Sequence, residues 1–359
     1  MRPFTAVEPP PRQGRELSEH KHTNMTTVQT NLLEHPAVKA WAKLQPEHVE
    51  PAAIERLQKK KKGVVYKLKG VGSGGSDIVA KWSSPERLLK ERIIYEEVLP
   101  ALPVSTVRYY GFIEDPDDRC CWLFLESADG EEYSPLVNDH RTLAAQWLSL
   151  LHTSAAHIAT AARLPDRGPG HYLEQLRQGG ETIQRNLTNP ALTAETRAML
   201  ETVVRQLEVV ASRWGQVEEL CECAPRTLMH GDFAPKNMRV RTGRAGLSLL
   251  PFDWGSVGRG VAAADLAQSG MEPNGYWNYW ANPDLAAYCS VARESWPRLD
   301  IQDVKQLAII GKIFRSLICI NLEAPSFAME WVENAARDMR LYQAAMADAI
   351  QAAGWNDCL

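Results

Sequence analysis

The chain has 359 residues, of which 45% are hydrophobic and 23% charged, and its formal net charge is −4. This length exceeds one comfortable hydrophobic core, and the composition is that of a soluble globular protein, so we expect two lobes. The small negative charge argues against binding to nucleic acid or to an anionic membrane, and no apolar run reaches the roughly 18 residues that span a bilayer. The N-terminal stretch lacks the apolar segment of a secretory signal, so we expect a cytoplasmic protein.

Residues 1–30 are polar and rich in proline, without a helical or strand period. We therefore expect a disordered N-terminal extension there. Met25 offers an alternative start, so it stays open whether residues 1–24 belong to the native protein. A helical pattern begins near Asn31 and continues through Val38 and Leu44.

Short β-rich runs follow, and they predict a small nucleotide-binding lobe over residues 31–126. The order is strand, strand, helix, strand, strand, which is typical of an α+β lobe built on an antiparallel sheet. The expected elements are a strand at 64–68, a glycine-rich turn at 70–76, a strand at 78–82, a helix from about Pro85, and strands at 107–113 and 121–126.

From residue 127 to residue 359 the pattern is mostly helical, which predicts a second, larger lobe. We expect helices at residues 142–162, 195–220, 302–321 and 327–352. A short β-rich island lies between them, at residues 238–241 and 247–252. The most polar and glycine-rich motifs of the chain flank this island, so we expect it to hold the active site.

Two motifs carry the chemistry. The first is His230-Gly231-Asp232-Phe-Ala-Pro-Lys-Asn237, and the second is Asp253-Trp-Gly at the end of a predicted strand. Phosphoryl transfer needs a carboxylate for the acceptor hydroxyl and hard oxygen ligands for Mg²⁺, and these motifs supply both. His230 is expected to brace the loop rather than to move protons. Either motif alone could be a helix cap or core packing, whereas the two in this order favour a functional site.

The H-G-D-x-x-x-x-N run followed by D-W-G resembles the aminoglycoside phosphotransferase and choline kinase family, which has a protein kinase-like fold. The resemblance covers roughly residues 55–330. It implies transfer of the γ-phosphoryl group of ATP or GTP to a hydroxyl, with Asp232 as the catalytic base and Asn237 and Asp253 as Mg²⁺ ligands. It also implies that Asp265, in a D-L-A segment, braces the catalytic loop.

The same resemblance points to a nucleotide site in the first lobe. Ile78-Val-Ala-Lys81 is similar to the V-A-I-K strand of kinases, so Lys81 is expected to hold the α- and β-phosphates. Glu91 in the next helix is the preferred partner of Lys81, and Glu96 and Glu97 remain alternatives.

Other nucleotide contacts are inferred from position. The turn at residues 70–76 directly precedes the Lys81 strand, so we expect a hairpin there and place the phosphate-covering loop near residues 59–62 and Gly63. Glu126 and Ala128 follow the last strand of the lobe and are expected to offer backbone groups to the base. His230 is counted with this nucleotide-binding group as a brace.

The acceptor is not determined by the sequence. The candidates that we expect near it are Glu272, Asp284, Glu323, Glu330, Tyr276, Trp277, Tyr279 and Trp280. The moderate number of acids favours an antibiotic or related natural product that is less cationic than an aminoglycoside. The alternatives are a housekeeping kinase for choline, ethanolamine or a sugar, and a nucleotide-binding pseudokinase that acts as an interaction module. The choice of ATP or GTP and the oligomeric state stay open.

Overall fold

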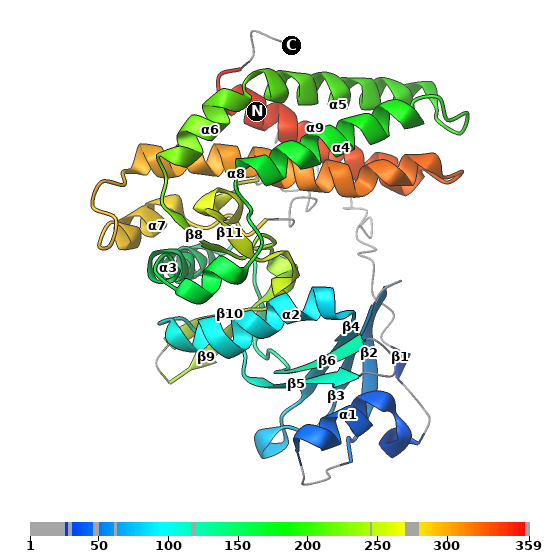
Figure 1. The fold of residues 1–359 in the computed structure, drawn as a ribbon, viewed down its shortest axis with the longest axis vertical. Coiled ribbons are helices and arrows are strands. Elements are labelled where there is room, and N and C mark those ends of the chain that lie inside the picture. Colours follow the sequence, from blue (N-terminus) through cyan, green and yellow to red (C-terminus); the bar gives the residue numbers. More distant parts are fainter. Residues whose placement is uncertain are drawn as a thin grey trace, which may run out of the picture.

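Six strands of an antiparallel sheet form the N-terminal lobe in the computed structural model of the protein (Figure 1). The structure describes residues 26–27, 31–45, 50–60, 63–115, 120–244, 246–269 and 280–355. The strands lie in the order β1-β2-β3-β4-β6-β5. Their bounds are β1 (Thr26–Thr27), β2 (Ile54–Lys60), β3 (Gly63–Leu68), β4 (Ile78–Ser83), β5 (Tyr109–Asp115) and β6 (Cys120–Glu126).

A helix covers each face of this sheet, and the alternation of side chains along β6 shows why. Trp122 and Phe124 point to one face, where they belong to the same buried cluster as α1 (Pro36–Leu44). Leu123 and Leu125 point to the other face and join the cluster that contains α2 (Pro85–Ile93). Since successive side chains of a strand alternate between faces, a strand that is buried on both faces is hydrophobic throughout.

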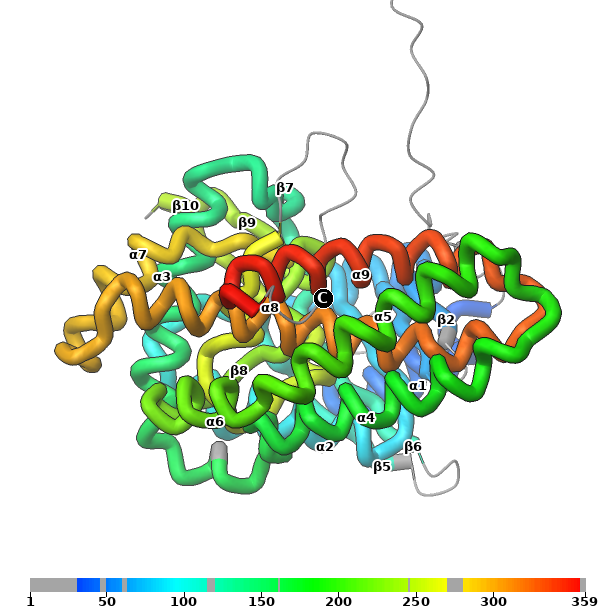
Figure 2. The backbone as a smooth tube through the Cα atoms, turned by 90° about the horizontal axis from the view of Figure 1, so that it is seen from above, coloured from blue at the N-terminus to red at the C-terminus, as the bar shows by residue number. Residues whose placement is uncertain are grey.

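The C-terminal lobe is mostly helical. Its helices are α3 (Asn138–Ala155), α4 (Pro169–Asn186), α5 (Ala194–Ser212), α6 (Trp214–Glu222), α7 (Leu285–Ala292), α8 (Ile301–Glu323) and α9 (Glu333–Ala352). Figure 2 looks onto the end farthest from the N-terminal lobe and shows α4, α5 and α9 running across it, with α8 beneath them. None of the helices in the described parts of the chain is long and apolar enough to cross a lipid bilayer.

Two small sheets lie between the helical layer and the N-terminal lobe. One has the order β10-β9-β7 and the other pairs β11 with β8. Their strands are β7 (Glu131–Glu132), β8 (Arg226–Met229), β9 (Met238–Gly243), β10 (Gly246–Pro251) and β11 (Gly258–Val261). The first motif connects β8 to β9, and the second connects β10 to β11. The strand pairing therefore brings the two motifs together.

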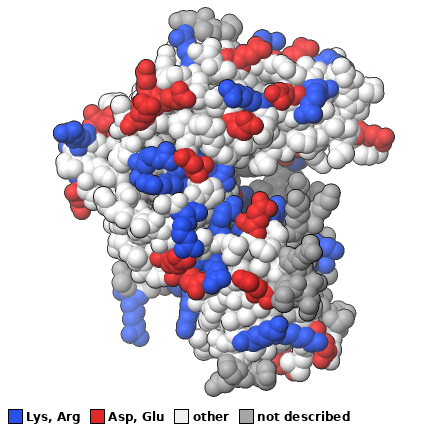
Figure 3. Space-filling model, in the orientation of Figure 1, with Lys and Arg blue, Asp and Glu red and all other residues white. Residues whose placement is uncertain are grey.

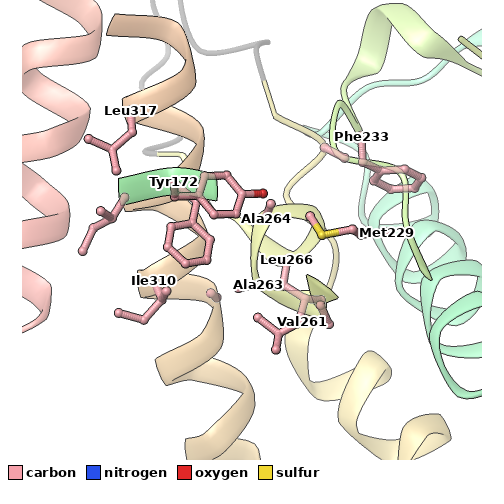
Figure 4. Close-up of a cluster of buried hydrophobic side chains, with 14 of the residues drawn as sticks. Tyr172, Met229, Phe233, Val261, Ala263, Ala264, Leu266, Ile310 and Leu317 are labelled. Carbon is pink, nitrogen blue, oxygen red and sulfur yellow. The ribbon is translucent and has the colours of Figure 1, made fainter. Parts of the chain in front are cut away.

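A hydrophobic core fixes α8 beneath the first motif (Figure 4). In this view, Ile310 and Leu317 of α8 lie on one side, and Met229, just before the motif, and Phe233, within it, lie on the other. The 3-10 turn Ala262–Leu266 lies between them. At Gly311 a side chain would collide with the backbone carbonyl of the turn, so only glycine permits this close approach of α8.

The sequence-based elements differ from the structure in several places. The helix expected at residues 195–220 is two helices, because the chain bends at Arg213 between α5 and α6. The last expected helix begins only at Glu333, after a 3-10 turn. Strand β2 was not among the expected elements, since five of its seven residues are charged or polar, and neither was α4. A Gly179-Gly180 pair interrupts the pattern of α4, and Gly179 lies against Asn321 of α8.

Two residues of the segment that we expect to be disordered, Thr26–Thr27, lie in a strand. These residues form β1 and pair antiparallel with β2, with Thr26 opposite Arg56. The outer strand of a sheet has unpaired backbone groups. A short β-branched segment can pair with them even when the residues around it in the sequence show no strand pattern. Residues 1–25 and 28–30 lie outside the described residues.

Candidate active site

The loop of the first motif is closed by a buried histidine. His230 is fully buried, and its Nδ1 accepts a hydrogen bond from the backbone N–H of Asp232 at 3.3 Å. Its Nε2 lies 3.2 Å from the carbonyl of Phe252, at the end of β10. Burial lowers the pKa of His230, so the ring is neutral and donates through Nε2. His230 thus ties the two motifs together, as expected of a brace, and it has no exposed surface for a ligand.

A buried carboxylate holds the same loop from below. Asp265 accepts hydrogen bonds from the backbone N–H of His230 at 2.7 Å and of Gly231 at 2.8 Å. It also lies 3.3 Å from the ring of His152 on α3. Burial alone would raise the pKa of Asp265, but these donors, His152 first, outweigh it and lower the pKa. Asp265 therefore braces the loop, in the place where the D-L-A segment suggested.

Gly231 is required by the path of the chain. Its φ angle is +77°, and a Cβ atom there would lie 2.5 Å from the carbonyl oxygen of Ser256 in the second motif. A residue with a side chain would be strained by the backbone angle and would also collide with Ser256. The first motif can pass beneath the second only because this position is glycine.

Asp232 is surrounded by hydrogen-bond donors. Its Oδ1 lies 2.7 Å from Nη2 of Arg315, and its Oδ2 lies 3.0 Å from both Nζ of Lys236 and Nδ2 of Asn237. Arg315 also donates to the carbonyl of Gly231. Burial favours the neutral acid, yet Arg315 and Lys236 outweigh this and hold the pKa of Asp232 far below its usual range. Asp232 is therefore an ionised, rigidly oriented acceptor.

An ion pair crosses from the second motif to the N-terminal lobe. Lys81 of β4 lies 2.8 Å from Oδ1 of Asp253, and also 2.8 Å from Oε2 of Glu91 on α2. Burial would lower the pKa of Lys81, but Glu91 and Asp253 raise it, so the amine is charged. Asp253 adopts a left-handed φ of 67° and its side chain is 46% exposed. The carboxylate is thus turned out of the core.

The three glutamates considered as partners of Lys81 have different roles. Glu91 is buried and contacts Lys81. Glu96 pairs with Arg92 at 2.7 Å, and Glu97 pairs with Arg163 of the C-terminal lobe at 2.7 Å. Both of these pairs are exposed, so only Glu91 is placed to orient the lysine.

Asn237 and Asp253 come from neighbouring backbone segments, and their side chains carry oxygen donors that fit a magnesium ion. The backbone carbonyl of Asn237 accepts a hydrogen bond of 2.9 Å from Phe252, the residue before Asp253. The amide nitrogen of Asn237 donates to two oxygens of Asp232, which leaves the amide oxygen as an acceptor. Mg²⁺ prefers hard oxygen ligands and keeps several waters, so one amide oxygen and one carboxylate are a sufficient protein contribution.

The structure limits what the expected base-binding segment can offer. The N–H of Glu126 donates to the carbonyl of Arg108 at 2.8 Å, and the N–H of Ser127 donates to Asp77 at 2.9 Å. The carboxylate of Glu126 is held by Arg241 at 2.6 Å and by the N–H of Arg108 at 3.0 Å. These N–H groups are not free for a base, so the N–H of Ala128 is the remaining donor of this kind among the positions named.

The expected phosphate loop is only partly described. β2 and β3 pair antiparallel on either side of it, while Lys61 and Lys62 lie outside the described residues. Gly63 begins β3, and a Cβ atom there would lie 2.9 Å from the carbonyl of Trp82 on β4. Glycine at this position therefore serves the close pairing of the strands. The turn at 70–76 joins β3 to β4, so it is a hairpin connection as expected.

The acceptor candidates divide into three groups. Glu272, Tyr276, Trp277 and Tyr279 lie outside the described residues. Asp284 caps α7 by accepting the N–H groups of Ala286 and Ala287, and Trp280 is buried, so these two have structural roles. Glu323 is the last residue of α8, the helix that carries Arg315, and Glu330 is an exposed residue beyond that helix. Among the described residues on the face seen in Figure 3, acidic and basic side chains are interspersed over both lobes.

Two residues of this site were missed in the sequence. Lys236 stands within the first motif but was not assigned a role. Arg315 is only 6% exposed although it lies in a helix. The signal that could have found it is a single arginine within the otherwise uncharged stretch of residues 313–320, because a lone charge on a buried helix face needs a buried partner.

Comparisons with known proteins agree with this geometry. Residues 66–301 match the model of the phosphotransferase enzyme family. No curated protein is similar enough in sequence to count as a relative.

Solved structures show the same fold. A spectinomycin phosphotransferase, solved with ADP and spectinomycin, is 11% identical with a TM-score of 0.57, over 85% of this chain and 94% of that one. A choline kinase from Cryptosporidium parvum is 13% identical with a TM-score of 0.57, over 89% and 96%. An ethanolamine kinase from Plasmodium vivax is 15% identical with a TM-score of 0.54, over 82% and 81%. At these identities the likeness establishes a kinase-like two-lobe fold and nothing finer.

Proposed function

Because the chain belongs to the phosphotransferase enzyme family, a kinase-type group of enzymes, we propose that it moves the γ-phosphoryl group of ATP or GTP to a hydroxyl of a small molecule. The observation that carries this proposal is the ion pair between Lys81 and Asp253. It joins residues 172 positions apart, at 2.8 Å, and so brings a lysine of the first lobe to the carboxylates of the second. Binding a nucleoside triphosphate needs a cation for its phosphates and ligands for its metal ion. This contact brings a lysine and a carboxylate of these two kinds together.

The roles follow from the contacts. Lys81, oriented by Glu91, binds the α- and β-phosphates. Asn237 and Asp253 would hold Mg²⁺, which neutralises charge on the phosphates when it is bound. Asp232 accepts a hydrogen bond from the acceptor hydroxyl and takes its proton as the new phosphorus–oxygen bond forms. Its lowered pKa makes it a weak base, so its main contribution is orientation.

We further propose an antibiotic or related natural product as the acceptor. The likeness to phosphotransferases for spectinomycin and hygromycin B supports this class. The likeness to a choline kinase and an ethanolamine kinase supports a second candidate, phosphorylation of an amino alcohol. A pseudokinase is the least supported reading, because Lys81, Asp232, Asn237 and Asp253 are all present, and pseudokinases commonly lack at least one of these four residues.

A turnover assay tests the proposal. The protein would be given Mg²⁺ with ATP or GTP and a panel of hydroxylated natural products, amino alcohols and sugars. We expect acceptor-dependent release of ADP or GDP, reduced on the order of 100-fold or more in Asp232→Ala. Asp129→Ala, which removes an exposed carboxylate paired with Arg241, is the matched control. Turnover that survives in Asp232→Ala would contradict the role of Asp232, and absence of nucleotide binding by the wild type would contradict the function itself.

A further inference from the structure

The carboxylate of Asp232 is held by two cations that differ in their freedom to move. The side chain of Arg315 is 7% exposed, and that of Lys236 is 68% exposed. Arg315 contacts Oδ1 and the carbonyl of Gly231, so it is fixed inside the lobe. Lys236 contacts Oδ2 alone, at 3.0 Å. An exposed ion pair of this kind contributes little to stability, so Lys236 can leave Asp232 at small cost, whereas Arg315 cannot.

The two oxygens also face different surroundings. Oδ2 is shared by Lys236 and by Asn237, which is one of the two residues of the proposed metal site. Oδ1 faces α8 and the core. The transferred phosphoryl group and the acceptor hydroxyl must therefore approach Asp232 on the Oδ2 side, where Lys236 lies in the free protein.

No other cation of the catalytic segment serves this side. Ala234 is buried and has no charge to offer. Lys81 is already engaged by Glu91 and Asp253. During transfer, negative charge spreads over the oxygens of the phosphoryl group and needs a positive partner close to the acceptor. A lysine ammonium is a compact charge with three donors, which suits a phosphoryl group.

We propose that Lys236 moves from Asp232 to the γ-phosphoryl group when a nucleoside triphosphate binds, and that this movement frees Oδ2 for the acceptor hydroxyl. The inference rests on the proposed function. The bond from phosphorus to the β-phosphate oxygen breaks, and the nucleoside diphosphate leaves. The acceptor oxygen bonds to phosphorus and its proton passes to Asp232. Lys236 remains protonated and only donates hydrogen bonds.

The test uses nucleotide binding and needs no acceptor. The full chain, with saturating Mg²⁺, is titrated calorimetrically with AMP-PNP and ADP, or with GMP-PNP and GDP if guanine nucleotides bind. We expect the wild type to bind the triphosphate analogue about 10-fold more tightly than the diphosphate, as one added charge-assisted contact allows. Lys236→Met should lose most of this preference while its diphosphate affinity stays within about 2-fold, and Lys236→Arg should keep it. Lys236→Gln repeats the Met variant should the latter be unstable.

Lys39→Met is the matched control, since Lys39 is also exposed and pairs with a carboxylate, Glu34. It lies on α1, at the end of the N-terminal lobe away from the C-terminal lobe (Figure 1). An unchanged triphosphate preference in Lys236→Met would overturn the proposal and leave Lys236 as a clamp on Asp232. Equal binding of both nucleotides by the wild type would overturn it as well, without contradicting a phosphotransferase. Binding of neither nucleotide would overturn the proposed function and this inference together.

Discussion

Arg315 is an enclosed cation whose hydrogen bonds go to the catalytic loop, to Asp232 and to the carbonyl of Gly231. Taking a guanidinium out of water is costly, and here the cost is offset only by these contacts. The same contacts keep Asp232 ionised in spite of its burial. Stability and reactivity of the loop therefore depend on one side chain that lies 83 positions away in the sequence.

Replacing Arg315 by Met should affect both properties. The buried carboxylate of Asp232 would lose its fixed partner, and breaking a buried pair costs about 3–5 kcal/mol in the free energy of unfolding. The pKa of Asp232 would rise, because burial favours the neutral acid once Arg315 is gone. The acidic limb of the pH profile of kcat/KM should therefore move to higher pH. Urea unfolding and a pH–rate profile measure the two effects.

Arg315→Lys is the control for this change, since it keeps the charge but loses the forked geometry. It should move the acidic limb less than Arg315→Met does. If the acidic limb stays where it is in the Met variant, Arg315 does not set the ionisation of Asp232.

At the scale of elements, α8 positions the loop through its close approach at Gly311. Arg315 follows one turn later, so any displacement of the helix displaces the guanidinium. Gly311→Ala would drive a methyl group into the carbonyl of Ala263. Overpacking of this kind costs about 1–3 kcal/mol, although alanine is the better helix former. We expect a lower melting temperature together with reduced turnover at an intact nucleotide affinity.

The matched control is Gly215→Ala in α6, where a Cβ atom would meet no other atom within 4 Å. Helix propensity then acts alone, and the change in stability should be neutral or favourable by up to about 1 kcal/mol. Equal effects of the two substitutions would mean that the contact with Ala263 does not constrain α8.

The sequence predicted the elements that carry the motifs better than the parts that support them. The strands around residues 238–252 and the Lys81 strand follow local periodicity and turn chemistry, and they lie where expected. The contact of Arg315 with Asp232 depends on how α8 crosses the 3-10 turn at Gly311, and no local pattern encodes such a crossing. Likewise, the pairing of β1 with β2 joins Thr26 to Arg56, and the local sequence of neither segment indicates the other as its partner.

At the scale of the whole molecule, the ion pair of Lys81 with Asp253 links the two lobes. If Asp253 holds Mg²⁺, a nucleotide should stabilise the protein more with the metal than without it. A ligand at 100 times its Kd adds about 2.7 kcal/mol to the stability of the folded state. In Asp253→Asn the thermal shift on adding AMP-PNP or GMP-PNP should be smaller and independent of Mg²⁺. Asp129→Asn should behave like the wild type, and a metal-dependent shift that persists in Asp253→Asn would exclude Asp253 as a ligand.

Acidification should weaken the fold well above the range in which carboxylates titrate. His171, at the start of α4, accepts a hydrogen bond from Arg167 at 2.8 Å, and burial together with this cation lowers its pKa to about 4. The unfolded chain binds a proton at His171 near pH 6.5, whereas the folded protein does not, so stability is complete above about pH 6.5. It should fall by up to about 1.4 kcal/mol per pH unit from there to about pH 4 for this one group.

Urea unfolding of the wild type and of His171→Gln between pH 8 and pH 4 separates this contribution from the rest. Glutamine can still accept from Arg167 but does not titrate, so the free energy of unfolding should decline less steeply in the variant below about pH 6.5. The buried ring of His230 also has a lowered pKa. Part of the decline in the free energy of unfolding should therefore remain in both proteins. Curves that run parallel over this range would show that His171 takes up its proton in the folded protein as readily as in the unfolded chain.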